Sequence, residues 1–329
     1  MGEIRVGTCG WNYPAGAGTW NGVFYPSRRR RGFDELAYYA EHFDTVEVNS
    51  SFYRPPEPSM VAAWMRRTPA SFLFAVKLYQ KFTHPDMYLA REGVKDWDLS
   101  RADFDQFRAG LTPLADAGRL AAVLAQFPPS FHADADTRAY LEWLLEGLIA
   151  YPVAVELRHR SWSDDAEATS KLLHGHGAAW ALIDEPKFQS SIRQGSGLPG
   201  FRPSTGSGRP ELVEGRGSEV LGGHGPLAYV RLHGRNAAAW WEHETPDDRY
   251  NYLYSRDELR PFAETAQAAA TTRKRVLVYF NNHFSAKAVA NATVLKHDLG
   301  QLLPGEYPAE MVKRYPELKD IVRVEGGLL

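Results

Sequence analysis

The 329-residue sequence has little cysteine, no long apolar segment and no excess of charge of either sign. Its single cysteine, Cys9, excludes an internal disulfide and is typical of a protein in a reducing compartment. Because no run of about 18 uninterrupted apolar residues occurs, no transmembrane helix is expected. Lys and Arg total 38 and Asp and Glu total 40. This balance disfavours nucleic acid as a partner, leaving only a local basic groove as a way to bind it.

The beginning of the chain offers no targeting segment. The first predicted strand starts at Ile4, which leaves no room for a signal peptide. A chain of this length can bury roughly 75% of its unfolded surface, so it needs neither a disulfide nor a structural metal for stability. We therefore expect a cytoplasmic protein with no membrane partner. The sequence leaves its oligomeric state open.

Eight short apolar runs alternate with helix-like or loop stretches along the chain. Each strand must then return by a crossover, as parallel strands require. Eight such β-then-α units predict a TIM (β/α)8 barrel, a single domain over residues 1–329, with its site at the carboxyl ends of the strands. The eight runs are Ile4–Gly10, Thr45–Asn49, Phe72–Lys77, Leu120–Phe127, Val153–Arg158, Ala178–Asp184, Leu227–Gly234 and Arg275–Asn282.

Helix signals lie between these runs. Apolar residues at spacings of three and four predict a helix over Phe33–Phe43. Capping-box patterns at Ser100–Asp103 and Ser255–Glu258 predict where two long helices begin. Ser163, followed by two aspartates, is expected to cap another helix. A last helix is predicted over Ser285–Leu299.

Two segments depart from this pattern. Residues 195–225 are rich in Gly, Ser, Arg and Pro and poor in side chains that pack, so we expect a disordered, mobile insertion between strands six and seven. A lid over the site and a glycine-rich phosphate loop are the alternatives, although neither GxGxxG nor GxxxxGK occurs there. Residues 300–329 contain several prolines and are predicted to form a C-terminal tail packed on the outside of the barrel.

Polar or charged side chains end seven of the eight predicted strands. Residues two apart on a strand point to the same side, which groups Glu156 with Arg158 and Arg231 with His233. Buried charges are costly unless they are paired, so either a ring of ion pairs or a ligand pocket explains them. The residues expected at this end of the barrel are Glu47, Asn49, Lys77, Gln126, Glu156, Arg158, Asp184, Arg231, His233, Asn281 and Asn282.

In a pocket, these residue types indicate acid–base chemistry on an anionic or polyhydroxylated molecule. Arg158 and Arg231 present forked donors that suit a carboxylate or a phosphate. Glu156 is the predicted general acid or base, with Glu47 acting on the opposite side and Lys77 stabilising developing negative charge. The predicted catalytic residues are Glu47, Lys77, Glu156, Asp184 and His233, and the predicted substrate-binding residues are Trp11, Asn49, Tyr53, Arg158, Arg231, Trp240, Asn281 and Asn282.

The predicted strand-to-helix loops are rich in aromatic residues and hold six of the nine tryptophans. Packing between long loops explains some of these rings, and others would offer stacking faces for a sugar ring or a base. Aromatic and charged groups in one concave region are typical of a small-ligand site. The loop histidines His84 and His159 are expected to be solvated, whereas His283 lies closer to the predicted site.

Six motifs spread along the chain carry a family resemblance: Val6–Trp11, Phe43–Tyr53, Gln126–Phe131, Val155–Trp162, Tyr229–Gly234 and Tyr279–Asn282. Through them the chain resembles the YecE-like family, domain of unknown function 72. The resemblance implies a TIM-barrel-like fold and no settled activity, and the family's members usually have a much shorter connection where residues 195–225 lie. Its motif positions coincide with Glu47, Asn49, Tyr53, Glu156, Arg158, Arg231, His233 and Asn281.

Three functions remain open. The leading hypothesis is an enzyme that applies acid–base chemistry, without a redox cofactor, to a small anionic or sugar-like substrate. The second, by analogy with barrel nucleases, is a metal-dependent phosphodiester hydrolase acting on nucleic acid. Glu47, Glu156, Asp184 and His233 would be its metal ligands, but three cations at the same level repel a divalent ion, so no metal or other cofactor is expected. The third is a non-catalytic ligand-binding or regulatory protein.

Overall fold

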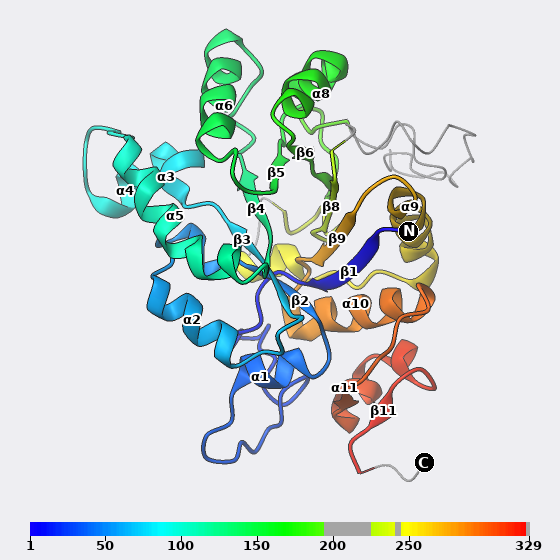
Figure 1. The fold of residues 1–329 in the computed structure, drawn as a ribbon. Helices are drawn as coiled ribbons and strands as arrows, with labels where there is room; N and C mark the ends of the chain where they lie inside the picture. Colours follow the sequence, from blue (N-terminus) through cyan, green and yellow to red (C-terminus); the bar gives the residue numbers. More distant parts are fainter. Residues whose placement is uncertain (194–224, 241–244, 327–329) are drawn as a thin grey trace.

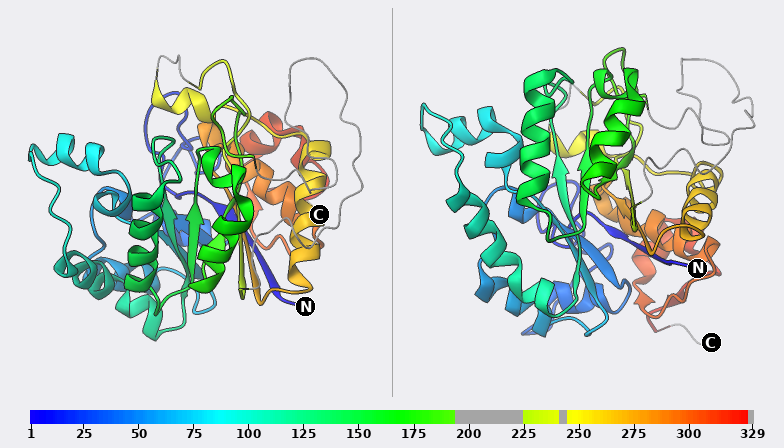
Figure 2. Two further views of the ribbon diagram at one scale, coloured as in Figure 1. Left: turned by 90° about the horizontal axis from the view of Figure 1, so that it is seen from above. Right: turned by 45° about the horizontal axis from the view of Figure 1, so that its top comes forward.

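The computed structural model describes residues 1–193, 225–240 and 245–326 and has an α/β fold with parallel sheets (Figure 1). The insertion expected at 195–225 lies outside the described residues, apart from Gly225. No helix within the described ranges is long and apolar enough to cross a bilayer. Figure 2 shows the strands in the middle of the molecule with helices around them.

Nine strands of the described chain form two parallel sheets, and all eight predicted runs contain them. The first sheet has the order β2 (Thr45–Val48), β3 (Leu73–Lys77), β4 (Leu120–Gln126), β5 (Val153–Glu156) and β6 (Ala179–Trp180). The second has the order β1 (Glu3–Thr8), β9 (Arg275–Phe280), β8 (Leu227–Leu232) and β7 (Leu182–Asp184).

The two sheets meet at two places. β6 and β7 belong to one extended segment interrupted at Ala181, whose N–H donates to the carbonyl of Val155 at 2.9 Å. On the other side, one parallel bridge joins Cys9, just after β1, to Glu47 of β2. Because only this bridge links β1 to β2, the sheet is not closed by a continuous ladder, and the predicted TIM barrel is not confirmed.

A side-chain hydroxyl explains the missing ladder between β1 and β2. The N–H of Thr8 donates to the Tyr39 hydroxyl at 3.0 Å, and that hydroxyl donates to the carbonyl of Thr45 at 3.1 Å. Tyr39 therefore occupies a place where the two backbones would otherwise pair directly. The backbones still approach closely nearby, since a Cβ added to Gly7 would lie 2.3 Å from the Thr45 carbonyl oxygen.

Replacing Gly7 by alanine is expected to destabilise the protein by about 1–3 kcal/mol, because the new methyl group would push β1 away from β2. The matched control is Gly175→Ala at the end of α8 (Ala166–Gly175), where an added Cβ meets nothing within 4 Å. Urea unfolding of both variants measures the difference. Equal stability of the two variants would contradict the close approach at Gly7.

The remaining helices lie between or beside the strands, and several begin where the sequence predicts. Ser255 caps α9 through a capping box with Glu258, and Ser100 does the same for α5 with Asp103. Their bounds are α1 (Glu35–Ala40), α2 (Pro58–Arg66), α3 (Gln80–Thr83), α4 (Pro85–Glu92), α5 (Arg101–Asp116), α6 (Ala135–Gly147), α7 (Ser161–Asp164), α9 (Arg256–Ala270), α10 (Lys287–Asp298) and α11 (Ala309–Arg314).

The cap predicted at Ser163 is wrong. Ser163 lies inside α7, and its hydroxyl donates to the Arg160 carbonyl at 2.8 Å. Asp165 caps α8 instead, with its carboxylate accepting from the N–H of Ala168 at 3.2 Å. The two aspartates after Ser163 have side chains that can also cap a helix, and the second of them, Asp165, caps α8.

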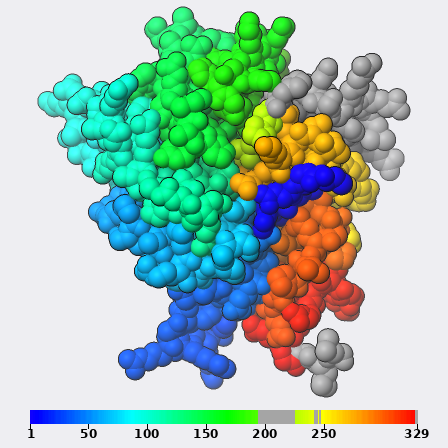
Figure 3. Space-filling model, viewed as in Figure 1, coloured from blue at the N-terminus to red at the C-terminus, as the bar shows by residue number. Residues whose placement is uncertain are grey.

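The C-terminal segment packs beside α10, as the ribbon and the space-filling view both show (Figures 1 and 3). Its short strands β10 (Glu306–Tyr307) and β11 (Arg323–Val324) pair with each other in parallel. Met311, Tyr315 and Leu318 are buried, and the Tyr315 hydroxyl donates to the carbonyl of Ser285. This contact links the tail to the loop that follows β9.

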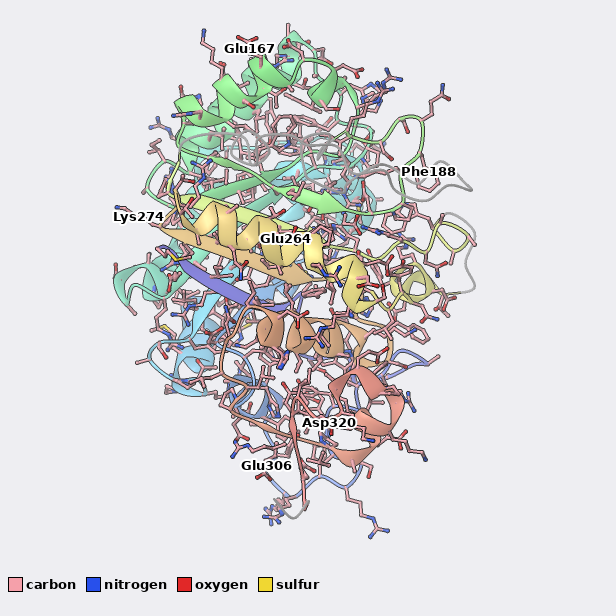
Figure 4. The ribbon with its side chains drawn as sticks, turned by 90° about the vertical axis from the view of Figure 1, so that its right-hand side faces the viewer. Glu167, Phe188, Glu264, Lys274, Glu306 and Asp320 are labelled. Carbon is pink, nitrogen blue, oxygen red and sulfur yellow. The ribbon has the colours of Figure 1, made fainter. Side chains whose placement is uncertain are left out.

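The carboxyl ends of the strands gather on one side of the molecule. In Figure 4, Lys274, which precedes β9, and Phe188, which follows β7, lie on opposite sides. A cluster of small and aromatic side chains from both sheets, including Ala75, Ala122 and Tyr279, fills the space between the strands. Charged residues follow this cluster toward the carboxyl ends, where the candidate site lies.

Candidate functional site

Arg231 of β8 is the centre of the site and is only 1% exposed. Its Nε and Nη2 donate to the two carboxylate oxygens of Glu47 at 2.9 and 2.7 Å, which forms a bidentate pair. Its Nη1 donates to Glu156 at 2.5 Å. Burial opposes the charge, but the carboxylates of Glu156 and Glu47 hold the pKa of Arg231 well above its usual value.

Glu156, at the end of β5, lies between two arginines. Its second oxygen accepts from Nε of Arg158 at 2.7 Å, two residues further along the chain. Burial alone would raise the pKa of Glu156, yet the charges of Arg231 and Arg158 hold it well below the usual value. The carboxylate is therefore ionised at neutral pH and is a weak proton acceptor.

Arg158 is the more accessible of the two arginines, with 15% of its side chain exposed. Its Nη1 lies 3.6 Å from Glu185, beyond hydrogen-bond distance. Within the part of the chain that the structure describes, this nitrogen has no hydrogen bond. Arg158 consequently keeps one donor edge available.

His233 is fully buried beside both arginines. Its Nδ1 contacts the Asn281 amide at 2.9 Å, and its Nε2 lies 3.4 Å from nitrogens of Arg158 and Arg231 and 3.6 Å from Glu156. Burial, followed by the charge of Arg231, lowers the pKa of His233 to about 3, so the imidazole is neutral at physiological pH.

Lys77 ends β3 and differs from every other charged group of the site. Its ammonium lies 4.0 Å from the centroid of the Phe52 ring. Over residues 1–193, 225–240 and 245–326, Lys77 Nζ has no hydrogen bond or ion pair. Burial, followed by the charge of Arg231, lowers the pKa of Lys77 to about 7. Near neutral pH the side chain therefore exists as both amine and ammonium.

His84 is a site residue that the sequence analysis missed. It lies where α3 meets α4, is buried rather than solvated, and packs edge-on against Phe52 with ring centroids 4.9 Å apart. Burial, followed by the charges of Lys77 and Arg158, lowers its pKa to about 3. The expectation of a solvated loop histidine was wrong because Phe52, from a distant part of the sequence, packs against a residue that local sequence places in a loop. Nothing in the local pattern signals this burial.

Comparisons with known proteins show which family the chain belongs to. A family model described as "Protein of unknown function DUF72" matches residues 5–311. This chain belongs to the DUF72 family. The UPF0759 protein YunF of Bacillus subtilis (strain 168) is 29% identical over 294 residues, 88% of this chain and 92% of YunF. The UPF0759 protein YecE of Escherichia coli (strain K12) is 26% identical over 167 residues, 49% of this chain and 56% of YecE.

Solved structures of the DUF72 family have the same fold. A DUF72 protein from Thermotoga maritima MSB8 superposes with a TM-score of 0.70 at 33% identity, covering 91% of this chain and 99% of that one. A DUF72 protein from Enterococcus faecalis V583 has a TM-score of 0.70 at 23% identity, covering 91% and 96%. The resemblance to the YecE-like family is thereby confirmed.

Asp184 of this DUF72 protein lies apart from the central arginine. Its carboxylate accepts from Arg235 at 2.8 and 3.1 Å and from the Tyr254 hydroxyl at 2.7 Å. In the β7–β8 register, Ile183 pairs with Arg231, so Asp184 falls on the alternate position. The structure thus separates Asp184 from the other predicted catalytic residues, Glu47, Lys77, Glu156 and His233.

Glu185, directly after Asp184, does reach the site, and Lys187 lies nearby; neither was among the predicted site residues. Glu185 is buried beside Arg158, and burial raises its pKa. Burial lowers the pKa of Lys187, whose Nζ donates to the Ile183 carbonyl at 3.4 Å. The charged run continuing beyond the predicted end of the strand was the signal that could have identified both.

The asparagines predicted to bind substrate also differ in their contacts. Asn281 contacts His233, whereas Asn282 donates to the Tyr252 carbonyl and to Asn291, both at 2.8 Å. Asn282 therefore connects the segment that contains Tyr252 to α10. Asn49, which follows β2, has a buried side-chain oxygen without a hydrogen-bond partner in the described chain.

The predicted aromatic ligands differ in exposure. Tyr53 is 54% exposed, whereas Trp240 is buried and packs edge-on against Tyr250 with centroids 6.4 Å apart. Trp11 packs edge-on against Trp64 at 6.0 Å. Of the three predicted rings, Tyr53 presents the most free surface to a ligand.

The predicted metal ligands are engaged with cations. Glu47 and Glu156 bind Arg231, and Asp184 binds Arg235. Among the described residues, no three His, Cys, Asp or Glu side chains are grouped to hold a metal ion. We use the name carboxyl-end site below for Glu47, Lys77, His84, Glu156, Arg158, Arg231 and His233.

Proposed function

We propose that this DUF72 protein is a cytoplasmic enzyme that binds a small anionic substrate at the carboxyl-end site and transfers a proton through Lys77. The observation that carries the proposal is the Lys77 ammonium, which has no ion-pair partner among the described residues, while Glu47 and Glu156 are both paired with Arg231. A cation that is built in and left unpaired is a candidate for function rather than for stability.

Arg158 would bind the anionic group of the substrate. Its available Nη1 and its partial exposure suit a carboxylate or phosphate arriving from solvent. Glu156 would hold this arginine in place through the 2.7 Å contact with Nε. A fixed guanidinium loses less side-chain entropy when it binds a ligand than a free one.

Proton transfer falls to Lys77 in place of Glu156. The two arginines keep Glu156 ionised, and the buried imidazole of His233 stays neutral. Lys77, with a pKa of about 7, populates both its acid and its base form at physiological pH. This match supports Lys77 as the general acid–base group.

We also propose that the two sheets act together as one (β/α)8 barrel. Support comes from the continuous β6–β7 segment and from the Cys9–Glu47 bridge. The site needs both sheets, since Glu47, Lys77 and Glu156 lie on one and Arg231 on the other. Closure would fix the spacing between these groups.

Thermal-shift screening of phosphorylated sugars and small carboxylates tests this function. We expect at least one anion to raise the melting temperature of the wild type and Arg158→Met to abolish that rise. For a ligand that turns over, Lys77→Met is expected to lower kcat by about 10²–10⁴-fold with the ligand still bound.

Lys187→Met is the matched control, since it removes a second partly buried lysine nearby and should retain most activity. Binding without turnover across the panel would favour a non-catalytic ligand-binding protein. If no anion shifts the melting temperature, the proposed function is wrong.

A further inference from the structure

Hydrogen bonds fix the backbone at Lys77, and a ring contact places its amine. The Ser51 hydroxyl donates to the Lys77 carbonyl at 2.6 Å. The next N–H along the chain, that of Leu78, donates to the Leu124 carbonyl of β4 at 2.9 Å. The Phe52 ring then supports the end of the side chain at 4.0 Å.

The neighbouring carboxylates are hydrogen-bonded to groups other than Lys77. Glu47 accepts two bonds from Arg231 and a third from the Tyr229 hydroxyl at 2.7 Å. Glu156 is shared between Arg231 and Arg158. Within the described residues, neither carboxylate forms an ion pair with the Lys77 amine, which leaves that amine able to act on a ligand.

We propose that Lys77 forms a Schiff base with an aldehyde or ketone substrate whose phosphate or carboxylate group is held by Arg158. This inference rests on the proposed function and names its substrate class. A fixed, partly desolvated lysine without a carboxylate partner has the properties of a nucleophilic amine. The lowered pKa of Lys77 supplies the unprotonated form at neutral pH.

The step balances without any further reactant. The neutral amine attacks the carbonyl carbon, a C–N bond forms, and the carbonyl oxygen is protonated to give a carbinolamine. Loss of that oxygen as water leaves a protonated imine. Relative to the starting ammonium, two of its three protons leave in the water and one stays on nitrogen, with no change of oxidation state.

The resulting cation would withdraw electrons from the neighbouring carbon of the substrate. A proton on that carbon then becomes more acidic. Arg158 would orient the anionic end while the carbonyl end reaches Lys77. Substrates with a carbonyl but no anionic group should therefore react poorly.

Reductive trapping tests the inference. Wild-type protein at pH 7 is incubated with glyoxylate, an aldehyde that carries a carboxylate, and reduced with borohydride. Peptide mass spectrometry then locates the secondary amine. We expect modification of one lysine per chain, at Lys77, and at least about tenfold less with acetaldehyde, which lacks the anion.

Three variants act as controls. Lys77→Met should lose the modification, Lys187→Met should retain it, and Arg158→Met should remove the preference for glyoxylate over acetaldehyde. Lys274, an exposed lysine on the opposite side of the molecule, reports the background reaction of surface amines (Figure 4).

The outcomes separate this inference from the proposed function. If anions raise the melting temperature but glyoxylate modifies Lys77 no more than Lys274, the Schiff base is overturned and the proposed function stands. If no anion raises the melting temperature and both aldehydes modify Lys77 equally, the proposed anion-binding function is overturned as well. Saturable, anion-dependent modification confined to Lys77 supports both.

Discussion

Replacing Arg231 by methionine is expected to destabilise the protein by about 3–5 kcal/mol. The guanidinium is 1% exposed and binds two fully buried carboxylates, those of Glu47 and Glu156. Its loss would leave both acids buried without a counter-charge, a cost far above that of the packing change alone. Urea unfolding at pH 7 measures the loss.

Two further variants are compared with Arg231→Met, one as a control and one as a rescue. Arg256→Met removes a mostly exposed arginine that pairs with Asp298, and it should cost less than about 1 kcal/mol. Adding Glu47→Gln and Glu156→Gln to Arg231→Met should restore part of the stability, because the unpaired charges are then gone. Equal stability of Arg231→Met and Arg256→Met would show that the central network is not desolvated as the structure indicates.

Replacing Lys77 by methionine is expected to stabilise the protein at pH 6 by about 3 kcal/mol. Burial and the Arg231 charge lower the pKa of Lys77 from 10.5 to about 7 in the folded protein. Below pH 7 the folded state carries the cost of a partly buried ammonium. Between pH 7 and 10.5 the unfolded chain holds a proton that the folded protein has released, so wild-type stability rises with pH.

The advantage of Lys77→Met should therefore shrink between pH 7 and 10. Unfolding free energies measured at intervals from pH 6 to 10 follow this convergence. Lys171→Met, on an exposed part of α8, should show no such pH-dependent difference from the wild type. A Lys77→Met variant that is less stable than the wild type at pH 6 would mean that the ammonium has a partner that stabilises it.

Together these two variants distinguish the roles within the carboxyl-end site. Arg231 is expected to be essential for the fold, whereas Lys77 is expected to cost stability and to be retained for chemistry. Such an opposition between stability and activity is common for catalytic groups. It cannot arise if the whole site is only a structural ring of ion pairs, in which every charged residue should stabilise the fold.

Much of the local structure could be predicted from sequence. Apolar runs separated by helical stretches identified the parallel strands, since such strands need crossovers. Capping boxes located the starts of α5 at Ser100 and α9 at Ser255, because a cap depends on residues three apart. Period-two alternation correctly placed Glu156 and Arg158 together, for the same local reason.

The partners across the molecule were decided by tertiary structure alone. Alternation within a strand says which residues share a face, but the stagger between strands decides whether Glu47 or Asp184 meets Arg231. The Tyr39 hydroxyl between β1 and β2 and the packing of His84 against Phe52 likewise depend on residues distant in sequence. The sequence by itself thus determined the strands and the charged residues at their ends. Only the packed structure, by pairing Glu47 and Glu156 with arginines, left Lys77 Nζ without a hydrogen bond or ion pair within the described residues.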